Sequence, residues 1–449
     1  MKRKEFLQLG SSLAVGSLLN SFSGCNDPKS FIPTTNWAGN ISFSTGDIVI
    51  PKTSDEVINL IKVAHNIKAQ GTTHCFNRIA DNKKQLMAMK SMNKVVELNK
   101  EQMTVTVEAG MRYGDLAPYL HENGLALHNL ASLPHISIAG SIATATHGSG
   151  VNNGNLATSV RSIEMVDGTG KLIVLSRDKD EDVFNGAVVA LGALGVVTKV
   201  TLDVQPAYDI KQYVYEALPN DSLYSNFESI MGAAYSVSLF TDWQSDSVNE
   251  VWVKTRTDGA NSFSTNENFF GARPATRDMH PIAANDAVHC TTQMGIAGPW
   301  FERLPHFKMG FTPSSGVELQ AEYFVPFEQG AEAMKTIAAM KNEIGPHLYI
   351  SEIRAIAADD LWLSTAYKRK SIAIHFTWKQ ETEAVMALLP KIENALAPFS
   401  PRPHWGKLFT IHKDILASRY ERMNDFKQLA LRHDPEEKFV NDFLTETIF

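Results

Sequence analysis

Residues 132–150 of this 449-residue chain read SLPHISIAGSIATATHGSG. Apart from His135 and His147, the segment consists almost wholly of small, hydroxyl-bearing or aliphatic side chains. Small side chains let the backbone approach a flat ligand closely, while hydroxyl and N–H groups supply hydrogen bonds. A tightly packed helical turn rich in Gly and Ala would have the same composition. The segment therefore predicts either close helix packing or one wall of a site for a planar ligand.

A second short, polar segment, residues 71–77, reads GTTHCFN and follows a predicted helix. Its small residues would let backbone N–H groups approach an anion such as a diphosphate. By composition alone, a single loop histidine such as His74 is more often a hydrogen-bonded bystander. We predict no metal site, because no Cys, Asp or Glu stands at ligand spacing near His135 and His147.

Two predicted strands carry polar residues at alternate positions. Glu352 and Arg354 stand two residues apart and so share one face of a strand, and His375 and Thr377 do the same on another. The loop at residues 402–407 adds further polar groups. These side chains predict the lining of a polyol site, although a solvent-exposed sheet face would show the same pattern.

The chain is long enough for two or three domains at about 100–200 residues each. Short strands and helices alternate up to residue 206, including a helix expected over residues 54–67 with Ser54 at its start. From residue 207 onward, longer alternating strands and helices such as 329–344 predict an antiparallel sheet with helices on one face. The expected fold class is α+β. The expected divisions are an export signal (1–25), a linker (26–40), a first domain (41–206), a second domain (207–385) and a C-terminal segment returning to the first domain and the interface (386–449).

Charge and cysteine content exclude several classes of protein. A formal net charge of −7 leaves no basic field for nucleic acid, and three cysteines cannot form a disulfide framework. The N-terminus has a basic start and then an apolar stretch too short for a spanning helix. The following Phe22-Ser23-Gly24-Cys25 resembles a lipobox. We therefore expect an exported protein, periplasmic or anchored by lipid on Cys25, although an ordinary unstructured N-terminus remains the alternative.

Taken together, the motifs resemble those of the vanillyl-alcohol oxidase class of flavoproteins, and within it the alditol oxidases. The resemblance spans roughly residues 36–443, and several motifs occur in one order. They are residues 36–40, 132–150, 234–243, 299–307, 311–316, 352–354, 375–378 and 402–407. The resemblance implies an FAD-binding domain followed by an α+β substrate (cap) domain with an antiparallel sheet.

The resemblance also implies a role for particular residues. His74 would bond covalently to the flavin, and Ser132, Glu352, Arg354 and Lys407 would bind the substrate. The remaining FAD contacts would be Gly71, Thr72, Thr73, Cys75, Ser132, Ser137, Gly140, Thr144, Ala145, Thr146, His147, Val196, Thr377 and His404. The chain departs from the family at Thr73 and Cys75, where Gly and Ser are usual.

The implied activity is oxidation of the primary alcohol of an alditol, such as xylitol or sorbitol, to the aldose, with oxygen reduced to hydrogen peroxide. Glu352, Arg354 and Lys407 would carry the chemistry, since cations stabilise a forming alkoxide and a desolvated lysine can accept a proton. A monomer is expected. A sugar-lactone oxidase or polyol dehydrogenase of the same fold is the alternative, and an exported sugar-binding lipoprotein is the alternative from a different class.

Overall fold

The computed structural model describes residues 34–449 except 260–262, 264–267 and 311–316. The predicted export signal, Cys25, much of the linker and the motif at 311–316 therefore lie outside the described residues. Thr35–Phe449 form one compact unit. Within the described part of the chain, no helix is both long enough and apolar enough to cross a membrane.

The first part of this unit begins with a small parallel sheet of order β1-β3-β2, which is joined by helix α2. Its elements are β1 (Ile48–Val49), α2 (Ser54–Val63), β2 (Ile67–Gln70) and β3 (Gln85–Ala88). The helix starts at Ser54 as predicted, and Thr53 caps it by accepting a hydrogen bond from the backbone N–H of Glu56. The predicted end was wrong, because Ile67 already belongs to β2.

A five-stranded antiparallel sheet forms the rest of the first part, in the order β4-β5-β9-β7-β8. The strands are β4 (Val95–Asn99), β5 (Thr104–Glu108), β7 (Val160–Asp167), β8 (Leu172–Ser176) and β9 (Gly195–Asp203). Helices α3 (Tyr113–Glu122), α4 (Ile138–Ala143) and α5 (Arg177–Val188) connect them. The short helix α4 lies inside the segment 132–150. Part of this segment of small side chains is therefore helical.

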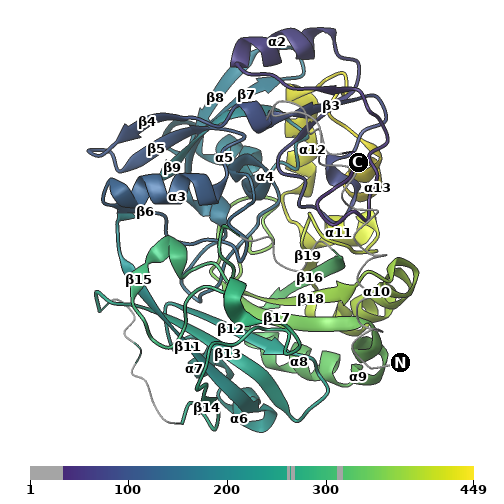
Figure 1. Ribbon diagram of the computed structural model, residues 1–449. Coiled ribbons are helices and arrows are strands. Elements are labelled where there is room, and N and C mark those ends of the chain that lie inside the picture. Colours follow the sequence, from purple (N-terminus) through teal and green to yellow (C-terminus); the bar gives the residue numbers. More distant parts are fainter. Residues whose placement is uncertain (1–33, 260–262, 264–267, 311–316) are drawn as a thin grey trace, which may run out of the picture. The chain divides into compact units, whose positions relative to one another are not determined.

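The second part is built on a nine-stranded sheet with antiparallel pairings throughout (Figure 1). Its main path runs β14-β11-β13-β12-β17-β18-β16-β19, and β15 pairs with β11. The strands are β11 (Asp209–Pro219), β12 (Ser236–Thr241), β13 (Ser247–Arg256), β14 (Arg273–Pro274), β15 (Gly298–Pro299), β16 (Glu318–Pro326), β17 (Leu348–Ile356), β18 (Ser371–Lys379) and β19 (Arg402–Pro403). This sheet confirms the α+β fold class.

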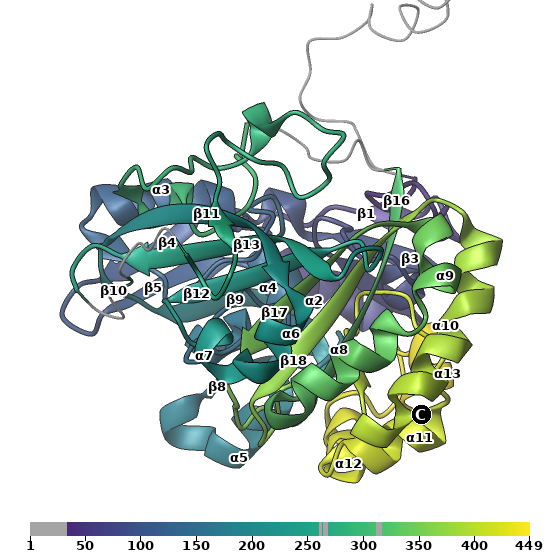
Figure 2. The same cartoon turned by 90° about the horizontal axis from the view of Figure 1, so that it is seen from below.

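Helices cover one face of the nine-stranded sheet; α8 packs against β18, as Figure 2 shows, and α7 packs against β12. The helices are α6 (Asn220–Ser225), α7 (Phe227–Met231), α8 (Gly330–Ala338), α9 (Lys341–Ile344) and α10 (Thr382–Leu396). The single helix expected over residues 329–344 is in fact two, α8 and α9. The opposite face is also buried along β18, whose residues from Ser371 to Trp378 are all buried. A buried face that carries charged residues is where a site can form.

The C-terminal helices return to the first part (Figure 1). These are α11 (Lys413–Arg419), α12 (Met423–His433) and α13 (Asp442–Thr447). Just before α13, Asn441 donates hydrogen bonds to the carbonyl oxygens of Arg78, Ile79 and Asp81. Lys68 of β2 donates to the carbonyl of Phe439. The last segment also contributes β19 to the large sheet, so it links the two parts.

Candidate active site

A cavity of about 320 Å³ lies between the large sheet and the loops of the first part. Its lining includes most of the predicted site residues: Gly71, Thr72, Thr73, His74, Cys75, Ser132, Ser137, Gly140, Thr144, Thr146, His147, Glu352, Arg354, Thr377, His404 and Lys407. Residues separated by more than 300 positions in the chain therefore meet at one place. The individual roles predicted for them remain predictions.

Two predicted contacts, Ala145 and Val196, are not part of this lining. The side chain of Val196 packs in a hydrophobic cluster with Val57 and Ile61. Its neighbours Gly195 and Val197 do line the cavity, because side chains alternate along β9. Ala145 is fully buried beside the lining residue Thr146. Any contact that these two residues make with a ligand would have to come from the backbone.

The wall from the first part is formed by two glycine-containing segments that pack closely together. Thr72 and Ser137 exchange two hydrogen bonds, from N–H of Thr72 to Oγ of Ser137 and from N–H of Ser137 to Oγ1 of Thr72. A Cβ at Gly71 would lie 2.1 Å from Oγ of Ser137, and one at Gly140 would lie 2.9 Å from it. A side chain at Gly71 would have to displace the hydroxyl of Ser137, which bonds the N–H of Thr72, so the wall at this point is formed by the backbone.

The loop at His74 is fixed on both sides. The imidazole stacks on Trp37 with the ring centroids 5.2 Å apart, and Nδ1 lies 2.9 Å from the carbonyl oxygen of Thr72. Asn36 donates to the carbonyl of Cys75, and the N–H of Trp37 donates to that of Thr73. Burial lowers the pKa of His74 to about 4, so the ring is neutral at physiological pH.

Thr73 has a φ of 56°, in the left-handed region that favours glycine. This explains in physical terms why glycine is the usual residue there in the family that the sequence resembles. Cys75 follows, and burial raises the pKa of its thiol to about 11, so the thiol stays protonated.

The cavity floor is a row of three ionisable side chains across neighbouring strands. His375 on β18 lies directly opposite Glu322 on β16 and, on its other side, opposite Glu352 on β17. All three line the cavity, and so does Arg354, two residues beyond Glu352. The two ring nitrogens of His375 are buried and have no hydrogen-bond partner among the described residues. Such buried polar atoms favour a polar ligand as their missing partner.

Glu322 is the residue that joins this floor to the loop after β19. Its Oε1 accepts a hydrogen bond from Nη2 of Arg354 at 2.7 Å, and its Oε2 accepts one from Nζ of Lys407 at 2.7 Å. Nε2 of His147 lies 3.2 Å from Oε1. Glu322 is fully buried, which alone would raise its pKa, but Lys407, Arg354 and His147 hold that pKa well below its usual range. The two cations are therefore held at a fixed separation by one carboxylate.

The cations respond to burial in different ways. Burial lowers the pKa of Lys407, and the carboxylate of Glu322 opposes this shift. The pKa of Arg354 is raised, because Glu352 and Glu322 outweigh burial. Arg354 also donates to Oγ of Ser132 at 3.4 Å, so it reaches across the cavity to the wall of the first part. Lys407 is the cation that is closer to giving up its proton.

Glu352 is held in turn by a histidine. Nε2 of His306 lies 2.7 Å from Oε1 of Glu352, and Nε of Arg354 lies 3.6 Å from the same oxygen. Burial would raise the pKa of Glu352, but Arg354 and His306 hold it below its usual range. Glu352 is therefore an anion that accepts hydrogen bonds at physiological pH.

Sequence reasoning missed Glu322 and His306 as site residues. A signal for Glu322 exists, since Glu318, Gln320 and Glu322 alternate along one strand face and all three line the cavity. His306 stands in a loop, and nothing in its local sequence indicates that it meets Glu352. Only the tertiary fold brings the two together.

Comparisons with known proteins agree with this geometry. A family model described as FAD binding domain matches residues 47–176, and one described as D-arabinono-1,4-lactone oxidase matches residues 315–447. An alditol oxidase from a Streptomyces species is 43% identical over 92% of this chain and 98% of its own. An L-gulono-1,4-lactone dehydrogenase from Mycobacterium tuberculosis is 28% identical over 91% and 97%. Cholesterol oxidase from B. sterolicum, at 16% identity, has the same fold, with a TM-score of 0.73 over 92% of this chain and 96% of that one.

Replacing the shared carboxylate should destabilise the protein. Glu322→Gln leaves Arg354 and Lys407 buried without their common anion, and breaking a buried ion pair costs about 3–5 kcal/mol. We expect a clearly lower melting temperature by circular dichroism. Glu322→Gln combined with Lys407→Met should recover part of the loss. The difference from the parent should shrink as the pH falls below 4.5, because the lowered pKa of Glu322 stabilises the fold only where the unfolded chain is ionised.

A matched control is Glu343→Gln, which removes an exposed carboxylate paired with Lys391. Exposed pairs contribute about 0–1 kcal/mol, so this variant should melt close to the parent. Equal melting temperatures for Glu322→Gln and Glu343→Gln would contradict the bridging role of Glu322.

Proposed function

Since the chain belongs to the alditol oxidase family, we propose that it is an FAD-dependent oxidase of sugar alcohols. It would convert the primary alcohol of an alditol such as xylitol or sorbitol to the aldose and reduce oxygen to hydrogen peroxide. The observation that carries the proposal is the buried polar floor of the cavity, with Glu322, His375 and Glu352 in one row beside Arg354 and Lys407. A polyol carries several hydroxyl groups, and each of them can form a hydrogen bond with one of these buried side chains.

The residues present fit an FAD. The cavity has a backbone wall at Gly71 and Gly140, where a side chain would clash with Ser137, and such a wall suits a flat ring system. Small side chains such as Thr144 and Thr146 continue the lining. The residues that would hold the cofactor are the two segments at 71–75 and 137–147, with Thr377 and His404 on the side of the sheet. When bound, FAD takes up the hydride from the alcohol carbon and passes the electrons to oxygen.

The chain's own groups would handle the hydroxyl proton and the developing charge. Arg354 and Lys407 place two cations in the cavity, where they stabilise an oxygen that gains negative charge. Burial lowers the pKa of Lys407, so of the two cations this is the one that more readily gives up its proton and can then accept the proton of the substrate hydroxyl. Glu352 stays ionised and accepts hydrogen bonds from further hydroxyls, and Ser132 offers its hydroxyl from the opposite wall.

A sugar lactone is the alternative substrate. It is favoured by one observation, the match of residues 315–447 to the D-arabinono-1,4-lactone oxidase model. The cavity floor belongs largely to this segment, so both substrate classes must be tested on the same protein. The FAD-binding match over residues 47–176 argues against a sugar receptor.

Loss of either cation should slow reduction of the flavin. Arg354→Ala and Lys407→Ala each remove a charge that stabilises the forming alkoxide, and one such donor is typically worth about 10²–10³ in rate. We expect anaerobic bleaching of the flavin by xylitol or sorbitol to slow by that factor.

Ser132→Ala should raise KM more than it lowers kcat, because it removes a hydroxyl contact.

The exposed Lys391→Ala serves as the control and should bleach at the parent's rate. If Arg354→Ala and Lys407→Ala also bleach at that rate, the site assignment fails. If the parent is bleached by a sugar lactone and by no linear polyol, the substrate class is wrong.

We propose that the FAD is bonded covalently to His74. The neutral imidazole, stacked on Trp37 and held by Thr72, has one nitrogen lone pair for bonding to the flavin. Acid-precipitated, denatured protein should stay yellow, and a peptide containing His74 should carry the mass of the flavin. His74→Ala should bind FAD loosely and oxidise slowly, whereas the exposed His412→Ala should retain the colour. Complete release of flavin from the denatured parent would refute the bond.

We also propose that the enzyme is exported as a monomer and is anchored by lipid on Cys25. The support is the basic start, the apolar stretch and the small residues before Cys25. Cys25→Ser should move the protein out of the membrane fraction of its host, and Cys290→Ser should leave it there. Finding the parent in the cytosol, with no lipid on Cys25, would contradict this location.

A further inference from the structure

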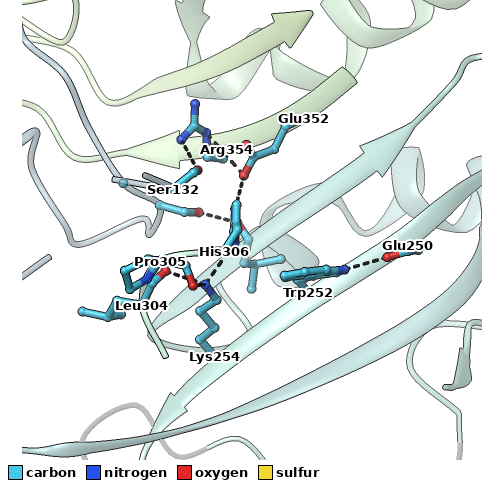
Figure 3. A network of polar contacts seen from close by, with 12 residues as sticks. Ser132, Glu250, Trp252, Lys254, Leu304, Pro305, His306, Glu352 and Arg354 are labelled. Carbon is cyan, nitrogen blue, oxygen red and sulfur yellow. Dashed lines mark hydrogen bonds and ion pairs between the residues drawn. The ribbon is translucent and has the colours of Figure 1, made fainter. Parts of the chain in front are cut away.

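Behind Glu352 lies a buried chain of polar groups that the reaction described above does not use (Figure 3). His306 connects to Glu352 through Nε2 at 2.7 Å and to Nζ of Lys254 through Nδ1 at 3.1 Å. His306 lines the cavity, whereas Lys254 contacts His306 and does not itself line the cavity. Lys254, on β13, is only 1% exposed. A buried lysine without a carboxylate in direct contact calls for an explanation.

The surroundings of Lys254 suit an ammonium group. Its Nζ donates to the carbonyl oxygens of Leu304 and Pro305 and to Nδ1 of His306. An ammonium has three N–H donors and no acceptor, so three acceptors satisfy it completely. Burial lowers the pKa of Lys254 to about 7, and Glu352 opposes this shift. Because Lys254 donates to Nδ1, the proton of the neutral imidazole must sit on Nε2, from which it is donated to Glu352.

Aromatic packing fixes the plane of the same imidazole. Trp252 and Phe240 meet the His306 ring edge to face, with centroids 5.1 Å and 5.5 Å away. Trp252 is itself held by a hydrogen bond from Nε1 to Oε2 of Glu250. Packing fixes the plane of the ring, and its contacts with Lys254 and Glu352 fix the tautomer. His306 therefore directs its single ring N–H, at Nε2, toward Glu352.

The backbone of His306 reaches the other side of the site as well. Its N–H donates to the carbonyl oxygen of Ser132 at 3.2 Å, and Arg354 donates to the hydroxyl of Ser132 at 3.4 Å. Arg354 in turn lies 3.6 Å from Glu352. Ser132, His306, Glu352 and Arg354 therefore form a closed ring of contacts, in which Ser132 belongs to the first part and the other three to the second.

We propose that His306, locked by Lys254, is a positioning residue that orients Glu352 and Ser132 toward the hydroxyl groups of the substrate. The proposal rests on the proposed polyol oxidation. His306 occupies Oε1 of Glu352 and so leaves Oε2 to accept a substrate hydroxyl. It acts through Glu352, and the expected signature is a change in KM for the polyol that exceeds the change in kcat.

The test compares variants of the flavin-loaded enzyme. His306→Leu removes the N–H and should lower kcat/KM for xylitol about 10- to 100-fold, chiefly through KM. His306→Gln, which keeps a side-chain N–H, should restore most of the loss. Lys254→Met should lower kcat/KM by less, because it removes the contact at Nδ1 but keeps the imidazole and its hydrogen bond to Glu352. The matched control is Lys335→Met, at an exposed lysine paired with Glu332 outside the site, and it should match the parent.

A double-mutant cycle shows whether His306 acts through Glu352. In a Glu352→Ala background, the additional effect of His306→Leu on kcat/KM should disappear, since the group it positions is gone. An undiminished effect in that background would overturn the proposal, and so would a His306→Leu single variant with the parent's KM.

A readout independent of activity comes from ¹⁵N NMR of the histidine side chains, assigned with His306→Gln. The parent should carry the His306 proton on Nε2; Lys254→Met should keep it there while Glu352 still accepts from Nε2, and only Lys254→Met combined with Glu352→Ala should show both tautomers. A parent with the proton on Nδ1 would overturn the lock even if polyols are oxidised. If the parent oxidises no polyol while the proton sits on Nε2, the proposed function fails and the positioning of a polyol fails with it, whereas the tautomer lock is upheld.

Discussion

One fully buried carboxylate, Glu322, organises the site. It accepts from Arg354 and Lys407 at 2.7 Å each and lies beside His147. Two unpaired cations could not be buried at this separation without an anion between them, because desolvation and mutual repulsion would both oppose it. The sheet supplies that anion at a fixed register, opposite His375. The positions of Arg354 and Lys407 in the cavity follow from this bridge.

A second carboxylate, Glu352, has the complementary task. Glu322 is occupied by cations of the protein on both oxygens, whereas Glu352 is held on one oxygen by a histidine. One glutamate therefore sets the structure of the site, and the other is available to a ligand. Both stay ionised for the same reason, since neighbouring cations outweigh the cost of burial. Two chemically identical side chains differ in role because their neighbours differ.

The sequence predicts the parts of the fold and site that depend on local order. Alternation along a strand correctly placed Glu352 with Arg354 and His375 with Thr377 on the cavity side. Local patterns could not place His306 against Glu352, because that contact depends on a loop path. They also could not show that one predicted helix is broken into α8 and α9, or that Thr73 adopts a positive φ. The motif resemblance supplied the FAD-binding fold, which periodicity alone left open.

The contacts of Asn36 and Trp37 limit how the chain can be trimmed. Asn36 holds the carbonyl of Cys75, and Trp37 both stacks on His74 and holds the carbonyl of Thr73. These two residues thus form part of the loop's support although they precede the first helix by more than a dozen positions. A truncation that removes Trp37 would take away one side of the support of His74, whereas a truncation that ends before Asn36 would leave these contacts intact. The shortest form of the chain that keeps the histidine loop intact must therefore still contain Asn36 and Trp37.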